Sequence, residues 1–143
     1  MSDATCVAFV CVQNAGRSQM ATAFAERERE RRGLDDRIEI VTGGTDPAEE
    51  VHGIVVEAMN ERGIDLSGRR PREVTPADLE SCEYVITMGC SAADVCPATW
   101  SGENRDWGLE DPDGRPIEEV REIRAEIETR VGNLFDELED RNE

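Results

Sequence analysis

The stretch VAFVCVQNAGRSQMA, Val7–Ala21, predicts a buried strand that runs into a polar loop and then into a helix. The near-continuous apolar run at 6–12 is typical of a strand that is buried on both faces. After the loop, Met20 and Phe24 lie one helical turn apart, and Gly33 is a suitable C-cap. This arrangement places one thiol, at the end of the strand, close to the N-terminus of a helix.

Six further segments with a regular apolar pattern follow this unit. We expect Gly43 and Gly44 to stop the first of them and Gly63 to end the second. Strands that alternate with helices indicate a parallel sheet with helices on both faces. The segments are a strand at 37–42, a helix at 51–59, a short helix opened by Thr75 and Pro76, strands at 84–88 and 105–107, and a long helix at 117–138.

Three residues capable of chemistry follow three of the predicted strands. Cys11 ends the first strand, Cys90 follows the strand at 84–88, and Asp111 follows the strand at 105–107. In an open parallel sheet, ligands bind beyond the carboxyl ends of the strands. We therefore expect these three side chains at one edge of the sheet.

The loop after Cys11 has the composition of an oxyanion site. Backbone N–H groups at a helix N-terminus stabilise a thiolate and also bind a tetrahedral anion. Arg17 adds a planar, permanently charged fork that binds two oxygens of such an anion. A nucleophilic sulfur at the base of this loop is suited to attack on phosphorus or arsenic. The predicted oxyanion-binding residues are Val12, Gln13, Asn14, Ala15, Gly16, Arg17 and Ser18.

Length and charge limit the class of protein. A chain of 143 residues is the size of one domain, and we expect residues 1–143 to form it. The formal net charge of −17 argues against nucleic acid or an anionic membrane as partner. No segment has the apolar length of a membrane span, which favours a soluble cytoplasmic protein. All 16 basic residues are arginine, which indicates adaptation to high salt or, alternatively, a bias towards arginine codons.

The five cysteines favour thiol chemistry over a disulfide framework, because their number is odd and the context is cytoplasmic. Paired Cys-x-x-Cys spacing is absent, so we expect no zinc site. We also expect no other metal and no cofactor. We expect Cys6 to be a buried apolar thiol within its strand. Cys82 is expected to be structural, with a role as a substitute redox partner as the alternative.

Three segments carry a resemblance to a known family. CVQNAGRSQMA, at 11–21, resembles the active-site loop of low-molecular-weight protein tyrosine phosphatases and, more closely, of their arsenate reductase relatives. GCSAADVCP, at 89–97, resembles the segment that carries the two further redox cysteines of the reductases. DWGLEDP, at 106–112, resembles the segment with the general acid of the family. The resemblance implies a flavodoxin-like three-layer α/β sandwich with a four-stranded parallel sheet.

The resemblance also implies a role for each residue of the site. It makes Cys11 the nucleophile, Arg17 the oxyanion clamp and Asp111 the acid that protonates a departing oxygen. Cys90 becomes the thiol that attacks the Cys11–arsenic adduct and releases arsenite. Cys96 then resolves the resulting disulfide and leaves a Cys90–Cys96 disulfide for an external reductant.

Some positions near the site carry alternatives or depart from the family. Gly16 stands where the phosphatases usually have a second cysteine in the loop, so Cys11 has no resolving partner there. Asp111 could instead be a turn former before Pro112, with Glu110 as the substitute acid. His52 is expected to open a helix or lie on its face, without a role in chemistry.

The predicted function is the reduction of arsenate to arsenite by a thiol–disulfide relay. The alternative is a phosphatase that hydrolyses phosphate monoesters through a phosphocysteine. Asp113 and Gly114 follow the acid–proline pair, where phosphatases of the family tend to place an aromatic residue, so the reductase is favoured. The expected partners are arsenate or a phosphate-like oxyanion, and thioredoxin, a glutaredoxin or a small thiol as the reductant.

Overall fold

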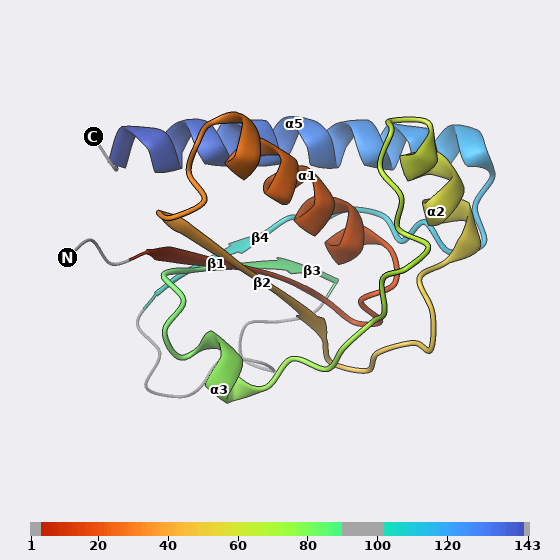
Figure 1. Ribbon diagram of the computed structural model, residues 1–143. Helices are drawn as coiled ribbons and strands as arrows, with labels where there is room; N and C mark the ends of the chain where they lie inside the picture. Colours follow the sequence, from red (N-terminus) through yellow and green to blue (C-terminus); the bar gives the residue numbers. More distant parts are fainter. Residues whose placement is uncertain (1–3, 90–101, 142–143) are drawn as a thin grey trace.

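The chain folds around a four-stranded, all-parallel sheet (Figure 1). The computed structural model describes residues 4–89 and 102–141. The elements in this part of the chain are β1 (Thr5–Cys11), α1 (Arg17–Arg31), β2 (Ile38–Gly44), α2 (Gly53–Asn60), α3 (Pro76–Leu79), β3 (Tyr84–Met88), β4 (Glu103–Asp106) and α5 (Ile117–Arg141). The strand order is β2-β1-β3-β4, so the chain reverses its direction of winding between β1 and β3, where α/β sheets bind ligands.

Helices cover both faces of the sheet, but unequally. Figure 1 shows α1, α2 and α5 on one face and the short α3 on the other. In β1, Val7 and Phe9 point into the core shared with α1 and α5, whereas Ala8 and Val10 point into the smaller core on the α3 side. The predicted three-layer, flavodoxin-like fold is therefore confirmed.

Most of the predicted element boundaries hold. Gly33, with φ of 66°, ends α1 in a Schellman arrangement, because Leu34 N donates to the carbonyl of Arg29. Thr75 opens α3 as expected, and it forms a capping box with Asp78. β3 has the predicted bounds, and β4 begins two residues before the predicted strand.

The prediction that Gly43 and Gly44 stop the second strand was wrong. Both belong to β2 and pair with the end of β1. A side chain on Gly43 would lie 2.7 Å from Cβ of Val74, and one on Gly44 would collide with the carbonyl oxygen of Val12. These glycines therefore allow other parts of the backbone to approach the end of the strand closely.

Arginines join α1 to α5. Within α1, Glu28 and Arg32 form an i,i+4 ion pair, with 3.0 Å between Oε1 and Nη2. Arg32 also reaches across to Asp136 at 3.0 Å and Glu139 at 2.6 Å on α5. The charged run at 26–32 therefore links the two helices as well as facing solvent.

A second group of charges holds the end of α2 against α5. Arg121 and Arg124 donate to the carboxylate of Glu61, directly after α2, and lower its pKa from 4.5 to about 2. These ion pairs fix the position of α2. His52, which directly precedes α2, belongs to the candidate site described below.

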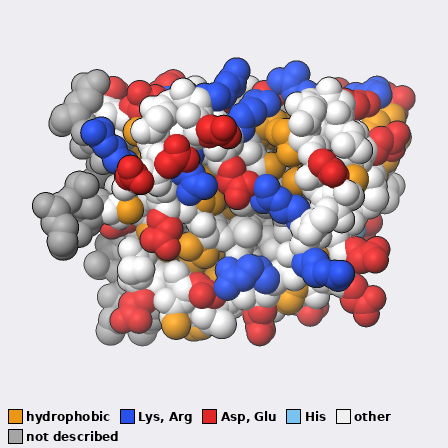
Figure 2. All heavy atoms as spheres, in the orientation of Figure 1, with side chains coloured by type: hydrophobic (Ala, Val, Ile, Leu, Met, Phe, Trp, Pro, Cys, Tyr) orange, Lys and Arg blue, Asp and Glu red, His pale blue; other side chains and the backbone are white. Residues whose placement is uncertain are grey.

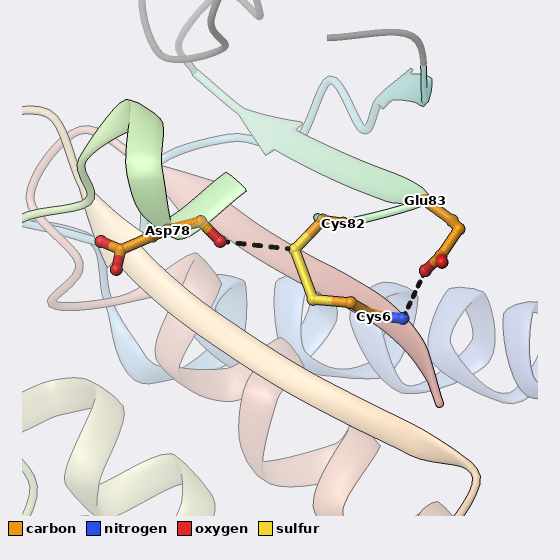
Figure 3. Close-up of a disulfide and its surroundings, with 4 residues drawn as sticks. All are labelled: Cys6, Asp78, Cys82 and Glu83. Carbon is orange, nitrogen blue, oxygen red and sulfur yellow. Dashed lines mark hydrogen bonds between the residues drawn. A yellow bond between two sulfur atoms is a disulfide. The ribbon is translucent and has the colours of Figure 1, made fainter. Parts of the chain in front are cut away.

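Cys6 and Cys82 form a disulfide, which corrects the expectation of an unpaired core thiol and of a framework free of disulfides (Figure 3). The Cα atoms are 4.4 Å apart, and both residues are 3% exposed within the smaller core. Next to the bridge, Cys6 N donates to the carboxylate of Glu83, and Cys82 Sγ lies 3.7 Å from the carbonyl oxygen of Asp78. The sequence did not reveal this pair because 76 residues separate its members.

Acidic and arginine side chains are interspersed over the face of the molecule in Figure 2, with small apolar areas between them. Several of the arginines are paired with carboxylates, but 33 acidic residues against 16 basic ones leave a large excess of negative charge. No helix in the described part of the chain has the length and apolar character needed to cross a bilayer.

Removal of the disulfide should destabilise the protein. In the loop-entropy account, a link between residues 76 apart contributes on the order of 4 kcal/mol, so a Cys6→Ala/Cys82→Ala variant should unfold at lower urea than wild type. Peptide mapping of the alkylated wild-type protein should recover the two cysteines as one linked pair. Absence of that pair, or equal urea midpoints, would contradict the cross-link.

Salt should stabilise the fold. Between about 0.1 M and 1 M potassium chloride the Debye length falls from about 10 Å to about 3 Å, which screens the repulsion among excess carboxylates. The melting temperature followed by circular dichroism should therefore rise over this range. An unchanged melting temperature would favour codon bias as the reason for the lysine-free composition.

Candidate active site

The loop between β1 and α1 is held by its carbonyl groups. Each of the six carbonyl oxygens from Cys11 to Gly16 accepts a hydrogen bond from an N–H donor. Two of these donors belong to α1, namely the side chain of Gln19 and the backbone of Met20. The other four are backbone N–H groups of the segment after β2, at Thr45, Asp46, Ala48 and His52.

This anchoring turns the N–H groups of the loop towards the sulfur. In a trans peptide, N–H and C=O point in opposite directions, and the described chain contains no cis peptide. With the carbonyls directed at residues 45–52 and at α1, the N–H groups of residues 12–17 face the other way. Asn14 N shows the result, because it lies 3.2 Å from Sγ of Cys11 and donates to it. A ring of such N–H groups binds anions.

Asn14 fixes the shape of the loop. Its φ of 53° is the left-handed conformation, which asparagine tolerates better than most residues. Its amide nitrogen donates to Ser18 Oγ at 2.7 Å and to Thr42 Oγ1 at 2.9 Å. Its amide oxygen accepts from Gln19 Nε2 at 3.1 Å and from Arg72 N at 3.0 Å. The side chain thus connects the loop to α1, β2 and the segment before α3.

Cys11 is the only free cysteine among the residues that the structure describes, and it is 2% exposed. Ser18 Oγ lies 2.8 Å from its sulfur. Because that oxygen already accepts from the amide of Asn14, its own hydrogen is available for donation to the sulfur. Together with the Asn14 N–H, this gives a thiolate two donors at the N-terminus of α1.

The guanidinium of Arg17 lies beside the segment between β4 and α5. Its Nη1 donates to the carbonyl oxygen of Leu109 at 2.9 Å, and its Nη2 lies 3.8 Å from Oδ2 of Asp111. Gly89, with φ of 90°, packs directly against it, since a side chain there would lie 2.8 Å from Nη2. The arginine is 11% exposed and its direction is therefore fixed from several sides.

Asp111, rather than Glu110, faces the pocket. Its Oδ1 accepts from Asp113 N at 3.0 Å, and its side chain is 52% exposed. Glu110 instead pairs with Arg115 at 3.1 Å and does not line the pocket. Asp111 forms a turn, but the same carboxylate lies near Arg17, so the two interpretations made from the sequence are compatible.

These side chains surround a cavity of about 370 Å³ at the carboxyl ends of β1 and β3. No Phe, Tyr or Trp is among its described lining residues. Trp107 packs against Phe9 with 6.0 Å between ring centroids, as a core residue. Within residues 4–89 and 102–141, no cluster of His, Cys, Asp and Glu is placed to hold a metal ion. The lining residues are Cys11, Val12, Gln13, Gly16, Arg17, His52, Gly89 and Asp111.

The structure thus brings together the predicted Cys11, Arg17 and Asp111 with the loop. Cys90 and Cys96 lie outside the described residues. Met88 pairs with Cys11 across the sheet, and Gly89, the residue before Cys90, lines the cavity.

The sequence did not point to two of the lining residues. His52 Nε2 lies 3.0 Å from Oε1 of Gln13, although we assigned this histidine no role. Gly89 follows a strand that ends at the ligand-binding edge, a position that could have indicated its place in the cavity. His52 had no such signal, because its expected place at the start of a helix does not indicate which distant loop it contacts.

Replacement of Gly89 should weaken anion binding. In Gly89→Ala the new methyl group must displace the guanidinium of Arg17, so the dissociation constant for inorganic phosphate, measured by calorimetry, should rise about tenfold or more. Gly63→Ala is the matched control, because Gly63 has a similar φ of 75° with open space around it. Equal phosphate affinities for the two variants would contradict the contact.

Comparison with known proteins places the chain in a family. Residues 6–143 match the low molecular weight phosphotyrosine protein phosphatase family. A protein of Halobacterium salinarum named "Putative arsenate reductase" is 63% identical over 130 residues, which are 91% of this chain and 90% of that protein. The glutaredoxin arsenate reductase of Synechocystis is 33% identical over 131 residues, with 90% and 95% of the two chains covered.

Solved structures agree with this placement. The thioredoxin-dependent arsenate reductase of Corynebacterium glutamicum superposes with a TM-score of 0.78 at 36% identity over 96% of this chain, which spans 63% of that longer chain. An arsenate reductase in its phosphate-binding state gives a TM-score of 0.78 at 32% identity, with 93% and 98% of the two chains covered. The chain belongs to the low molecular weight phosphotyrosine protein phosphatase family, among its arsenate reductases.

Proposed function

We propose that this protein reduces arsenate to arsenite, with Cys11 as the nucleophile. The observation that carries the proposal is the position of the Cys11 sulfur at a cavity lined by inward-facing N–H groups, Arg17 and Asp111. Arsenate is a tetrahedral oxyanion of the size and charge that such a cavity accommodates. The similarity to an arsenate reductase in a phosphate-binding state supports an oxyanion as the substrate.

In the first step, the thiolate of Cys11 attacks arsenic and forms a sulfur–arsenic bond. One arsenic–oxygen bond breaks, and the departing hydroxide takes the proton of Asp111 and leaves as water. Arg17 and the N–H groups of residues 12–17 stabilise the negative charge on the remaining oxygens. Arsenic is still in its +5 state at this point.

In the second step, the thiolate of Cys90 attacks the sulfur of Cys11. A disulfide forms, the sulfur–arsenic bond breaks, and its electron pair stays on arsenic, which leaves as arsenite in the +3 state. Cys96 then attacks Cys90, which frees the Cys11 thiolate and leaves a Cys90–Cys96 disulfide. The two cysteines follow Gly89 in the chain, and Gly89 already lines the cavity.

An external thiol reductant closes the cycle by reducing the Cys90–Cys96 disulfide. Relatives of this chain are named for thioredoxin and for glutaredoxin, so either protein, or a small thiol, is a candidate. The Cys6–Cys82 disulfide takes no part in the relay. Cys6 and Cys11 lie five residues apart on β1, at about 3.3 Å per residue, and their side chains are on opposite faces.

Cys11→Ser should abolish arsenite production from arsenate, because a serine hydroxyl is a far weaker nucleophile and provides no sulfur for the relay. The assay supplies thioredoxin and its reductase, a glutaredoxin with glutathione, or dithiothreitol, and measures arsenite directly. Cys6→Ala/Cys82→Ala is the control and should retain activity at a temperature where it is folded. Turnover by Cys11→Ser would refute the proposal.

Serine variants of Cys90 and Cys96 separate reduction from ester hydrolysis. Each should stop multiple-turnover arsenate reduction, since the relay lacks one thiol. Each should spare any hydrolysis of an aryl phosphate, which needs only Cys11, Arg17 and Asp111. If arsenate reduction and ester hydrolysis respond equally to each variant, the two cysteines are structural, the relay is wrong and the phosphatase alternative gains.

A further inference from the structure

Gly16 and Pro112 pack against each other at the edge of the cavity. A Cβ atom on Gly16 would lie 2.9 Å from Cγ and 3.4 Å from Cδ of the proline ring. Both residues are buried, and Gly16 is the N-cap of α1. The ring of Pro112 therefore occupies the space that any side chain at position 16 would need.

Two contacts flank Asp111 and join its segment to the start of α1, and Arg115 Nε also donates to the carbonyl oxygen of Asp111 at 2.8 Å. Arg17 binds the carbonyl oxygen of Leu109 on one side of it, at 2.9 Å. Pro112 rests on Gly16 on the other side. Asp111 lies between these two attachments, with a half-exposed side chain whose Oδ2 is 3.8 Å from Nη2 of Arg17.

We infer that Gly16 is a positioning residue for Asp111: the missing side chain lets Pro112 pack onto the loop, and this contact sets the height of the carboxyl group above Cys11. The inference rests on the proposed function, in which Asp111 protonates the departing oxygen. A side chain at position 16 displaces Pro112 and moves the adjacent carboxyl group away from that oxygen. The hydroxide then leaves without its proton, so the formation of the sulfur–arsenic bond slows.

The loop itself does not depend on this contact. Its carbonyl groups are held by the segment at 45–52 and by α1, and Asn14 is held by its own side-chain hydrogen bonds. A substitution at Gly16 that acts through Asp111 should therefore lower kcat and leave anion binding nearly unchanged. Damage to the cradle would raise the inhibition constant of phosphate instead.

The test is a double-mutant cycle between Gly16→Ala and Asp111→Asn, measured as kcat for arsenate reduction and as the inhibition constant of inorganic phosphate. Loss of a general acid costs about 10²-fold or more, so Asp111→Asn should lower kcat by that order. Gly16→Ala should lower kcat about tenfold with a phosphate constant within about twofold of wild type. In the Asp111→Asn background, Gly16→Ala should have no further effect on kcat.

Pro112→Ala alters the other partner of the same contact. It provides a second test if Gly16→Ala folds poorly. It removes the Cγ and Cδ atoms that meet position 16, so it should lower kcat by itself. The Gly16→Ala/Pro112→Ala protein should regain part of the rate lost in Gly16→Ala, because the new methyl group fills the vacated space. Gly132→Ala, in open space on α5, is the control for a generic glycine effect.

The outcomes distinguish the positioning role of Gly16 from the acid role of Asp111. If Gly16→Ala and Pro112→Ala lower kcat equally in both backgrounds, or raise the phosphate constant in step with the loss of kcat, Gly16 does not act through Asp111 and the inference is overturned. If Asp111→Asn itself keeps the wild-type kcat, the acid role in the proposed function falls, and the role of Gly16 falls with it. If only Asp111→Asn loses activity, the proposed function stands without this contact.

Discussion

The candidate site depends on one constraint, which is that every carbonyl oxygen from Cys11 to Gly16 is directed away from the cavity by a hydrogen bond. Peptide planarity then directs the N–H groups inward. A polar loop of this length would otherwise sample many conformations, and each would cost free energy to reorganise around an anion. Here the segment at 45–52 and the first turns of α1 hold the orientation before any anion arrives.

The surrounding fold makes this anchoring possible through close backbone approaches. The segment at 45–52 reaches the loop because β2 ends beside β1 at Gly44, where a side chain would collide with Val12. Two other glycines likewise leave room for a close neighbour. The guanidinium of Arg17 packs against Gly89, and the ring of Pro112 packs against Gly16. The disulfide links the start of β1 to the residues just before β3, at the end of the sheet away from the site. It therefore supports the two strands that carry the site without taking part in it.

Local patterns predicted the features that depend on local physics. The apolar run before Cys11 predicted β1, and the short spacing between Cys11 and Arg17 predicted an anion loop. Features that depend on contacts between distant residues could not be found in this way. The place of Gly44 inside β2, the pairing of Cys6 with Cys82 and the position of His52 follow from packing across 30 to 80 residues, for which a single sequence contains no period or motif.

The inward direction of the loop N–H groups is the central claim, and amide NMR tests it most directly. Inorganic phosphate, added to the reduced ¹⁵N-labelled protein, should shift the amide signals of residues 12–18 most strongly, in proportion to its occupancy of the cavity. The amides of Thr45, Asp46 and Ala48, which are already bonded to loop carbonyls, should shift much less. Large shifts at those three residues with small shifts in the loop would contradict the account.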